Sequence, residues 1–144
     1  MKRSPLRKKS KNPTAECKDR IQKLLRELVI LRDGGCVLRH FPEAGRCGGY
    51  RKDGEQILQA EHLNSRQYSV SYADPRNIVC LCLSHHSFFK QKNGALYWKL
   101  IEKIIGGKRW DWLQRVIEDR KSHHFGLWDW EKAELALKQE IEKL

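Results

Sequence analysis

The spacing of apolar residues begins with a long helical pattern near the N-terminus. Between residues 14 and 32, apolar side chains recur every three or four positions, which predicts an amphipathic helix. Thr14 is a candidate N-cap residue, and the run Asp33-Gly34-Gly35 ends the pattern. We expect this helix to pack over the central part of the chain, with Cys17 as a core residue on its buried face.

The central part of the chain favours two strands followed by a helix. Residues 36–55 are rich in Gly and Arg and are typical of a loop. Two short apolar runs, at 57–62 and 78–81, have the length of strands and are separated by a loop at 63–76. Residues 84–92 can then form a helix. The order strand, long loop, strand, helix is the outline of a small metal-stabilised unit.

The C-terminal part of the chain is helical in pattern. Three amphipathic segments cover residues 96–105, 110–117 and 128–144, and their tryptophans are expected to be packing residues. The fold class is therefore α+β and mostly helical. We expect residues 1–13 to be a flexible basic arm and residues 14–144 to form a single domain.

The charge of the chain points to a polyanionic partner. Its 144 residues include 29 Lys and Arg against 18 Asp and Glu, a formal net charge of +11. Nucleic acid is the first candidate and an anionic membrane surface the second. No apolar run approaches the ~18 residues that cross a bilayer. The basic N-terminus also lacks the apolar stretch of a secretory signal. We therefore expect a cytoplasmic protein that does not bind membranes.

Cysteine and histidine are concentrated in the middle of the chain, where eight of the eleven lie between positions 36 and 86. Five cysteines in a chain without a secretory signal indicate metal binding and not a disulfide framework. Cys82 and His85 form a Cys-x-x-His step that can fill two positions of a tetrahedral zinc site. The best upstream candidates for the other two ligands are Cys36 and Cys47, and His40 or Cys80 could replace either.

A second group of polar residues is left over once the zinc ligands are assigned. Glu61 and His62 are neighbours at the end of a strand, so their side chains lie on opposite faces. One of them can ligate a metal while the other faces a substrate. His86 follows directly after His85, so on a helix it points about a quarter-turn away, toward a separate site.

These residues resemble the motif of the HNH (ββα-metal) nucleases. The resemblance rests on Ala60-Glu61-His62 and on Asn77-Ile78-Val79-Cys80-Leu81-Cys82-Leu83-Ser84-His85-His86. The string that starts at Arg32 further resembles small phage and prophage HNH enzymes that nick DNA. The resemblance covers residues 36–92. It implies a ββα-metal finger with a structural zinc, packed against the N-terminal helix and a helical extension at 94–144.

The resemblance also implies a role for each residue of the motif. His62 matches the general base that activates water, and Glu61 and His86 match the ligands of a catalytic Mg²⁺ or Mn²⁺. Asn77 matches the residue that orients the loop bearing the base and can approach the metal site. In the zinc knuckle, His85 stands where the family usually has a second Cys. The chain also departs from the family pattern in having Glu61 in place of Asp or His, and ten residues between the upstream cysteines where two are usual.

The sequence therefore predicts a metal-dependent DNA endonuclease that nicks one strand with loose sequence preference. It would act as a monomer or weak dimer, without a small-molecule cofactor, in a bacterial or phage-infected cell. A non-catalytic zinc-stabilised DNA-binding module is the main alternative, and a zinc-scaffolded protein-interaction domain is a third. The residues expected to contact DNA phosphates are Arg66, Arg76, Lys90 and Lys92.

Overall fold

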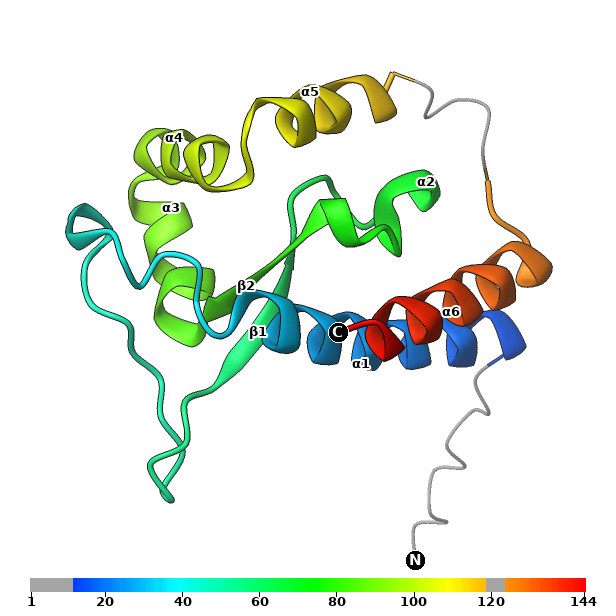
Figure 1. Cartoon of the computed structure of the whole chain (residues 1–144), viewed down its shortest axis with the longest axis horizontal. Coiled ribbons are helices and arrows are strands. Elements are labelled where there is room, and N and C mark those ends of the chain that lie inside the picture. The colour runs from blue at the N-terminus through cyan, green and yellow to red at the C-terminus, as the bar shows by residue number, and fades with distance from the viewer. Residues whose placement is uncertain (1–11, 119–123) are drawn as a thin grey trace, which may run out of the picture.

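A two-stranded antiparallel sheet lies between two groups of helices in the computed structural model, which describes residues 12–118 and 124–144 (Figure 1). Helices α1 and α6 lie side by side on one face of the sheet, and α4 and α5 lie on the other. This arrangement is α+β and mostly helical, as the sequence predicts. The elements are α1 (Pro13–Asp33), β1 (Leu58–His62), α2 (Ser69–Tyr72), β2 (Ile78–Cys82), α3 (Lys90–Lys92), α4 (Gly94–Ile105), α5 (Gly107–Val116) and α6 (Leu127–Glu142).

Helix α1 confirms the predicted N-terminal helix but starts earlier than expected. Its N-cap is Asn12, whose side chain accepts a hydrogen bond of 2.8 Å from the backbone N–H of Ala15, so the assignment of Thr14 as the cap was wrong. Pro13 occupies the first turn, where its missing N–H costs nothing. Gly34 ends the helix with φ 69°, as expected for a left-handed C-cap. Most of the predicted basic arm, residues 1–11, lies outside the described residues.

The two strands pair from Leu58 opposite Cys82 to His62 opposite Ile78. Alternation along β2 sends its side chains into two different cores. Ile78 and Cys80 pack with α1 and α6, whereas Val79 and Leu81 pack with α4 and the first loop. Helix α1 packs against both strands and so covers the central part of the chain, as expected, but Cys36, Cys47, Cys82 and His85 lie on the opposite face of the sheet.

The segment after β2 is helical, as predicted for residues 84–92. It begins with a π-helical turn (His85–Phe89) and continues into α3. A π turn is wider than an α turn and often occurs at functional sites. The predicted loop at 63–76 is more ordered than expected, because it contains α2 and a 3₁₀ turn at Pro75–Asn77.

The C-terminal helices form at the predicted places. Helix α6 packs along α1, where Arg20 and the mostly buried Glu134 form an ion pair of 2.9 Å. The packing role expected of the tryptophans holds for Trp130, which is 3% exposed, but Trp128 is 69% exposed. None of the described helices combines the length and apolar content needed to cross a membrane.

Two arginines from different helices hold the start of β2. Arg32 of α1 and Arg109 of α5 both donate to the backbone carbonyl of Ile78, at 2.6 Å and 2.7 Å. Asp33 accepts from Arg32 at 2.7 Å and from the backbone N–H of Cys80 at 2.9 Å. Burial lowers the pKa of Arg109 to about 10. These contacts attach both α1 and α5 to the strand that carries the candidate site.

We expect Arg109→Met to lower the free energy of unfolding by about 2 kcal/mol, because it removes the charged hydrogen bonds that Arg109 donates to the backbone carbonyls of Arg76 and Ile78. Urea unfolding of wild-type and variant protein measures this loss. Lys108→Met is the matched control, since Lys108 is exposed on the same helix, and it should change stability by less than ~0.5 kcal/mol. Equal unfolding midpoints for the two variants would contradict the role given to Arg109.

Candidate metal centre and neighbouring histidine site

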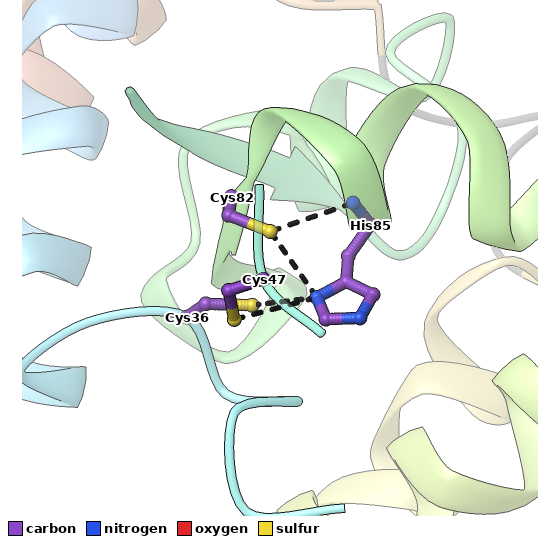
Figure 2. Close-up of side chains that lie close together, drawn as sticks. All are labelled: Cys36, Cys47, Cys82 and His85. Carbon is purple, nitrogen blue, oxygen red and sulfur yellow. Dashed lines mark hydrogen bonds between the residues drawn. The ribbon is translucent and has the colours of Figure 1, made fainter. Parts of the chain in front are cut away.

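Three cysteines and one histidine converge on one face of the sheet (Figure 2). Their ligand atoms all lie within 4.8 Å of one another. Nδ1 of His85 lies 3.2 Å from Sγ of Cys82, 3.3 Å from Sγ of Cys36 and 3.7 Å from Sγ of Cys47. A tetrahedral zinc site separates its ligand atoms by ~3.5 Å, so this spacing fits a metal ion.

The ligands come from four separate parts of the chain. Cys36 follows the end of α1, Cys47 belongs to the long first loop, Cys82 ends β2 and His85 opens the π-helical turn. The loop carrying Cys47 is drawn close to the residues after β2. Gly49 has φ 84°, and a Cβ added there would lie 2.5 Å from the Cβ of Leu83, so a larger residue would displace the loop. Neither alternative ligand joins the cluster, because His40 is exposed and Cys80 faces α1.

The surroundings of the cluster orient His85 as a ligand and favour the binding of a cation by the thiols. Nε2 of His85 donates to the backbone carbonyls of Ala44 and Gly45 at 3.0 Å and 3.2 Å, which leaves Nδ1 as the ligand atom. Burial raises the pKa of the Cys36 and Cys47 thiols, so thiolates at these positions require a nearby positive charge. The four predicted ligands thus form a cluster that could hold a structural metal such as zinc.

The two predicted ligands of a second metal also come together. Oε2 of Glu61 lies 2.7 Å from Nε2 of His86, and Oε1 of the same carboxylate accepts from Nζ of Lys90 at 3.0 Å. Glu61 is only 8% exposed, so this carboxylate is held between His86 and Lys90 and away from bulk water. In the helical turn after β2, the side chain of His85 therefore points to the cysteines, whereas that of the next residue, His86, points to Glu61. Lys90, which we expected to contact DNA, contacts Glu61.

His62 lies beside this pair along β1 but makes different contacts. Its ring packs against Tyr72, with 5.0 Å between ring centroids, and its Nε2 donates to the backbone carbonyl of Tyr72 at 2.9 Å. This bond leaves Nδ1 as the unprotonated nitrogen of the neutral ring. Nδ1 is buried and has no hydrogen-bond partner among the described residues. Burial lowers the pKa of His62, which keeps the ring neutral at pH 7.

Asn77 holds the loop that follows His62. Its side chain is fully buried, accepts from the backbone N–H of Asn64 at 2.6 Å and donates to the backbone carbonyl of Ser71 at 3.0 Å. These bonds join the start of the loop to its end. The bonds place Asn77 as a positioning residue, and within the described chain its side chain does not bond to Glu61 or His86.

We expect Asn77→Ala to lower the free energy of unfolding by about 2–3 kcal/mol, because it removes two buried hydrogen bonds and leaves their backbone partners unpaired. Amide hydrogen exchange gives a local readout: the Asn64 amide should lose protection more than amides of α6 do. Asn93→Ala is the control, because Asn93 is exposed and its side chain makes no capping bond. Retained protection at Asn64 would show that Asn77 does not hold the loop.

A basic hollow of about 420 Å³ lies between α1 and β1, next to His86. The predicted DNA contact Arg66 lines it, and Lys92 is exposed on α3. Arg76 is exposed but engaged, since it pairs with Asp74 at 2.8 Å and its guanidinium lies 3.8 Å from the ring centroid of Trp112. The lining residues are Gln22, Lys23, Arg26, Gln59, Ala60, Arg66 and His86.

Sequence reasoning missed the part of this hollow that α1 contributes. Gln22 and Arg26 are one helical turn apart, and Lys23 lies beside them. Their spacing on the polar side of an amphipathic helix was visible in the sequence. The sequence does not show which strand this polar side of the helix contacts, because that depends on how α1 packs against the sheet.

No protein-family model matches the chain, and neither a curated protein nor a solved structure gives a significant match. The function must therefore be inferred from the chain's own residues. Three features matter for that inference: the Cys/His cluster, the Glu61–His86 pair with its neighbour His62, and the basic hollow beside them.

Proposed function

We propose that this chain is a metal-dependent DNA endonuclease of the HNH, ββα-metal type. The observation that carries the proposal is the 2.7 Å approach of Glu61, from β1, to His86, from the turn after β2, beside a basic hollow. An oxygen and a nitrogen ligand next to positive side chains suit the hydrolysis of a phosphodiester by a bound cation. The order of two antiparallel strands and a helical segment, with Cys and His at the joints, supports the same assignment.

The Cys/His cluster would bind a structural zinc ion. Three buried or half-buried thiols and one oriented imidazole are a donor set typical of structural zinc. The ion would join the end of β2 to the first loop and to the turn that carries His86. A small two-stranded sheet gains most from such a cross-link, because it has little core of its own.

Glu61 and His86 would hold the catalytic Mg²⁺ or Mn²⁺. One carboxylate and one neutral imidazole leave most of the coordination positions to water and phosphate, as these cations prefer. When bound, the cation stabilises the negative charge that develops on the phosphate. Lys90, 3.0 Å from Glu61, adds a further positive charge at this place.

His62 would act as the general base. Tyr72 holds Nε2 through its backbone carbonyl, so Nδ1 is the atom that accepts the proton of the attacking water. A buried nitrogen without a partner costs about 1–3 kcal/mol, a cost that hydrogen bonding to a water molecule relieves. Asn77 keeps the loop after His62 in place and so positions the base.

One base and one cation would cut one strand in each encounter, which predicts a nicking enzyme. The test is a supercoiled plasmid incubated with the zinc-loaded protein in Mg²⁺ or Mn²⁺. Open circles should accumulate before any linear product, and no reaction should occur without the added cation. A plasmid that is bound but stays intact in both cations would instead support the non-catalytic DNA-binding module.

A further inference from the structure

The hollow between α1 and β1 has the chemistry of an anion-binding site. Three of its lining side chains, Lys23, Arg26 and Arg66, carry full positive charges, and none of the residues that line it is acidic. Gln22 and Gln59 add amide groups that can donate hydrogen bonds. The cations lie on two sides, since two come from α1 and Arg66 comes from the loop after β1.

Arg26 is held in a way that leaves it available to a ligand. Its Nε donates to the backbone carbonyl of Leu58 at 2.8 Å, which fixes the guanidinium against β1. The two terminal nitrogens have no partner among the described residues. A guanidinium anchored through Nε loses little further conformational entropy when its terminal N–H groups bind a phosphate.

Residues on the same side of α1 also contact Tyr72, which holds His62, the proposed general base. Nε2 of Gln22 donates to the phenolic oxygen of Tyr72 at 2.6 Å, and the backbone carbonyl of Tyr72 holds His62. Nζ of Lys18, one turn before Gln22, lies 4.9 Å from the centroid of the Tyr72 ring. His86 also lines the hollow and is the partner of Glu61.

We propose that this hollow binds the phosphodiester backbone of the DNA strand that is cut, with Lys23 and Arg26 of α1 and Arg66 of the loop contacting its phosphates. Helix α1 is then a DNA-binding element as well as a packing element. This proposal rests on the proposed function, because it places the strand beside Glu61, His62 and His86.

Binding of a labelled DNA duplex, measured by fluorescence anisotropy without added Mg²⁺ or Mn²⁺, tests the proposal apart from cleavage. Removing one charged side chain that binds a phosphate should reduce the slope of log Kd against log salt by about 0.9. The double variant Lys23→Gln/Arg26→Gln should therefore lower the slope by about two and bind at least ~10-fold more weakly at physiological salt. Arg66→Gln should lower it by about one.

The matched control is Lys99→Gln/Lys108→Gln, which removes two exposed charges from α4 and α5, on the other side of the sheet (Figure 1). It should leave the slope unchanged. Arg26→Lys should keep the slope while weakening binding, because lysine keeps the charge but lacks the guanidinium fork. Circular dichroism establishes that each variant keeps the wild-type helix content.

The outcomes separate this proposal from the proposed function. If the α1 double variant has a reduced slope but the wild-type protein does not cleave the plasmid, the phosphate site is supported and the proposed nuclease activity is contradicted. If the wild-type protein cleaves the plasmid but the folded double variant keeps the wild-type slope and affinity, the phosphate site is contradicted and the proposed nuclease activity stands.

Discussion

Replacing His62 with alanine is expected to lower the single-turnover rate of plasmid nicking by about 10²–10⁴-fold, the usual contribution of a positioned general base. The variant loses Nδ1, the nitrogen that would take the proton from water, and keeps Glu61 and His86. Gel separation of supercoiled and open-circular plasmid in Mn²⁺ measures the rate.

Two controls separate a loss of chemistry from a loss of structure. His40→Ala changes an exposed histidine outside both sites and should nick at the wild-type rate. The His62→Ala protein should also bind Mn²⁺ with wild-type affinity by electron paramagnetic resonance, because neither proposed ligand has changed. A folded His62→Ala protein that nicks within threefold of wild type would remove His62 from the mechanism.

Cys82→Ala is expected to abolish tight zinc binding and cooperative unfolding of the sheet. Structural zinc contributes roughly 10–16 kcal/mol of apparent binding energy in small metal-dependent folds, as much as the whole stability of an ordinary domain. Elemental analysis should fall from one zinc per chain to none. Thermal unfolding by near-ultraviolet circular dichroism should lose its sharp transition, since Tyr97 and Phe89 pack near the cluster.

Cys80→Ala provides the matched control on the same strand. Cys80 is also fully buried but faces α1, so its loss should cost about 1 kcal/mol and leave the zinc content at one per chain. A folded wild-type protein without zinc, or a Cys82→Ala protein that retains it, would contradict the assignment of the cluster.

Much of the fold followed from periodicity. The apolar stripe of α1 and the amphipathic C-terminal segments predicted helices that the structure contains, because such stripes must be buried against a neighbour. The N-cap was misplaced because Thr14 and Asn12 both suit that position, and only the backbone geometry distinguishes them. The short helix α2 was missed because its residues, Ser69–Tyr72, carry no helical pattern and are held by contacts to Asn77 and Gln22.

The metal cluster was the most predictable part of the candidate site. Cys82 and His85 are linked by local spacing, but Cys36 and Cys47 could be chosen over His40 and Cys80 only once the chain was folded. Cys80 shows why: alternation alone would place it on the same face as Cys82, two residues later, yet in the folded chain Cys80 packs against α1 and Cys82 joins the core that contains Cys36.

Contacts between distant segments could not be predicted at all. Arg32 and Arg109 are far apart in the sequence, yet both bind the carbonyl of Ile78. Arg26 similarly reaches the carbonyl of Leu58. Backbone carbonyls carry no sequence signal, so an arginine that binds one looks like any other surface charge.

Glu61 and His86 are proposed to hold the cation needed to cut DNA, and the decisive experiment is plasmid nicking in Mn²⁺ by wild-type and Glu61→Gln protein. Glutamine keeps the shape of Glu61 but removes the charge that would bind the cation. We predict that the zinc-loaded wild-type protein converts supercoiled plasmid to open circles and that the folded Glu61→Gln variant does not. An intact plasmid with wild-type protein in Mn²⁺, or equal nicking by the two proteins, would contradict the claim.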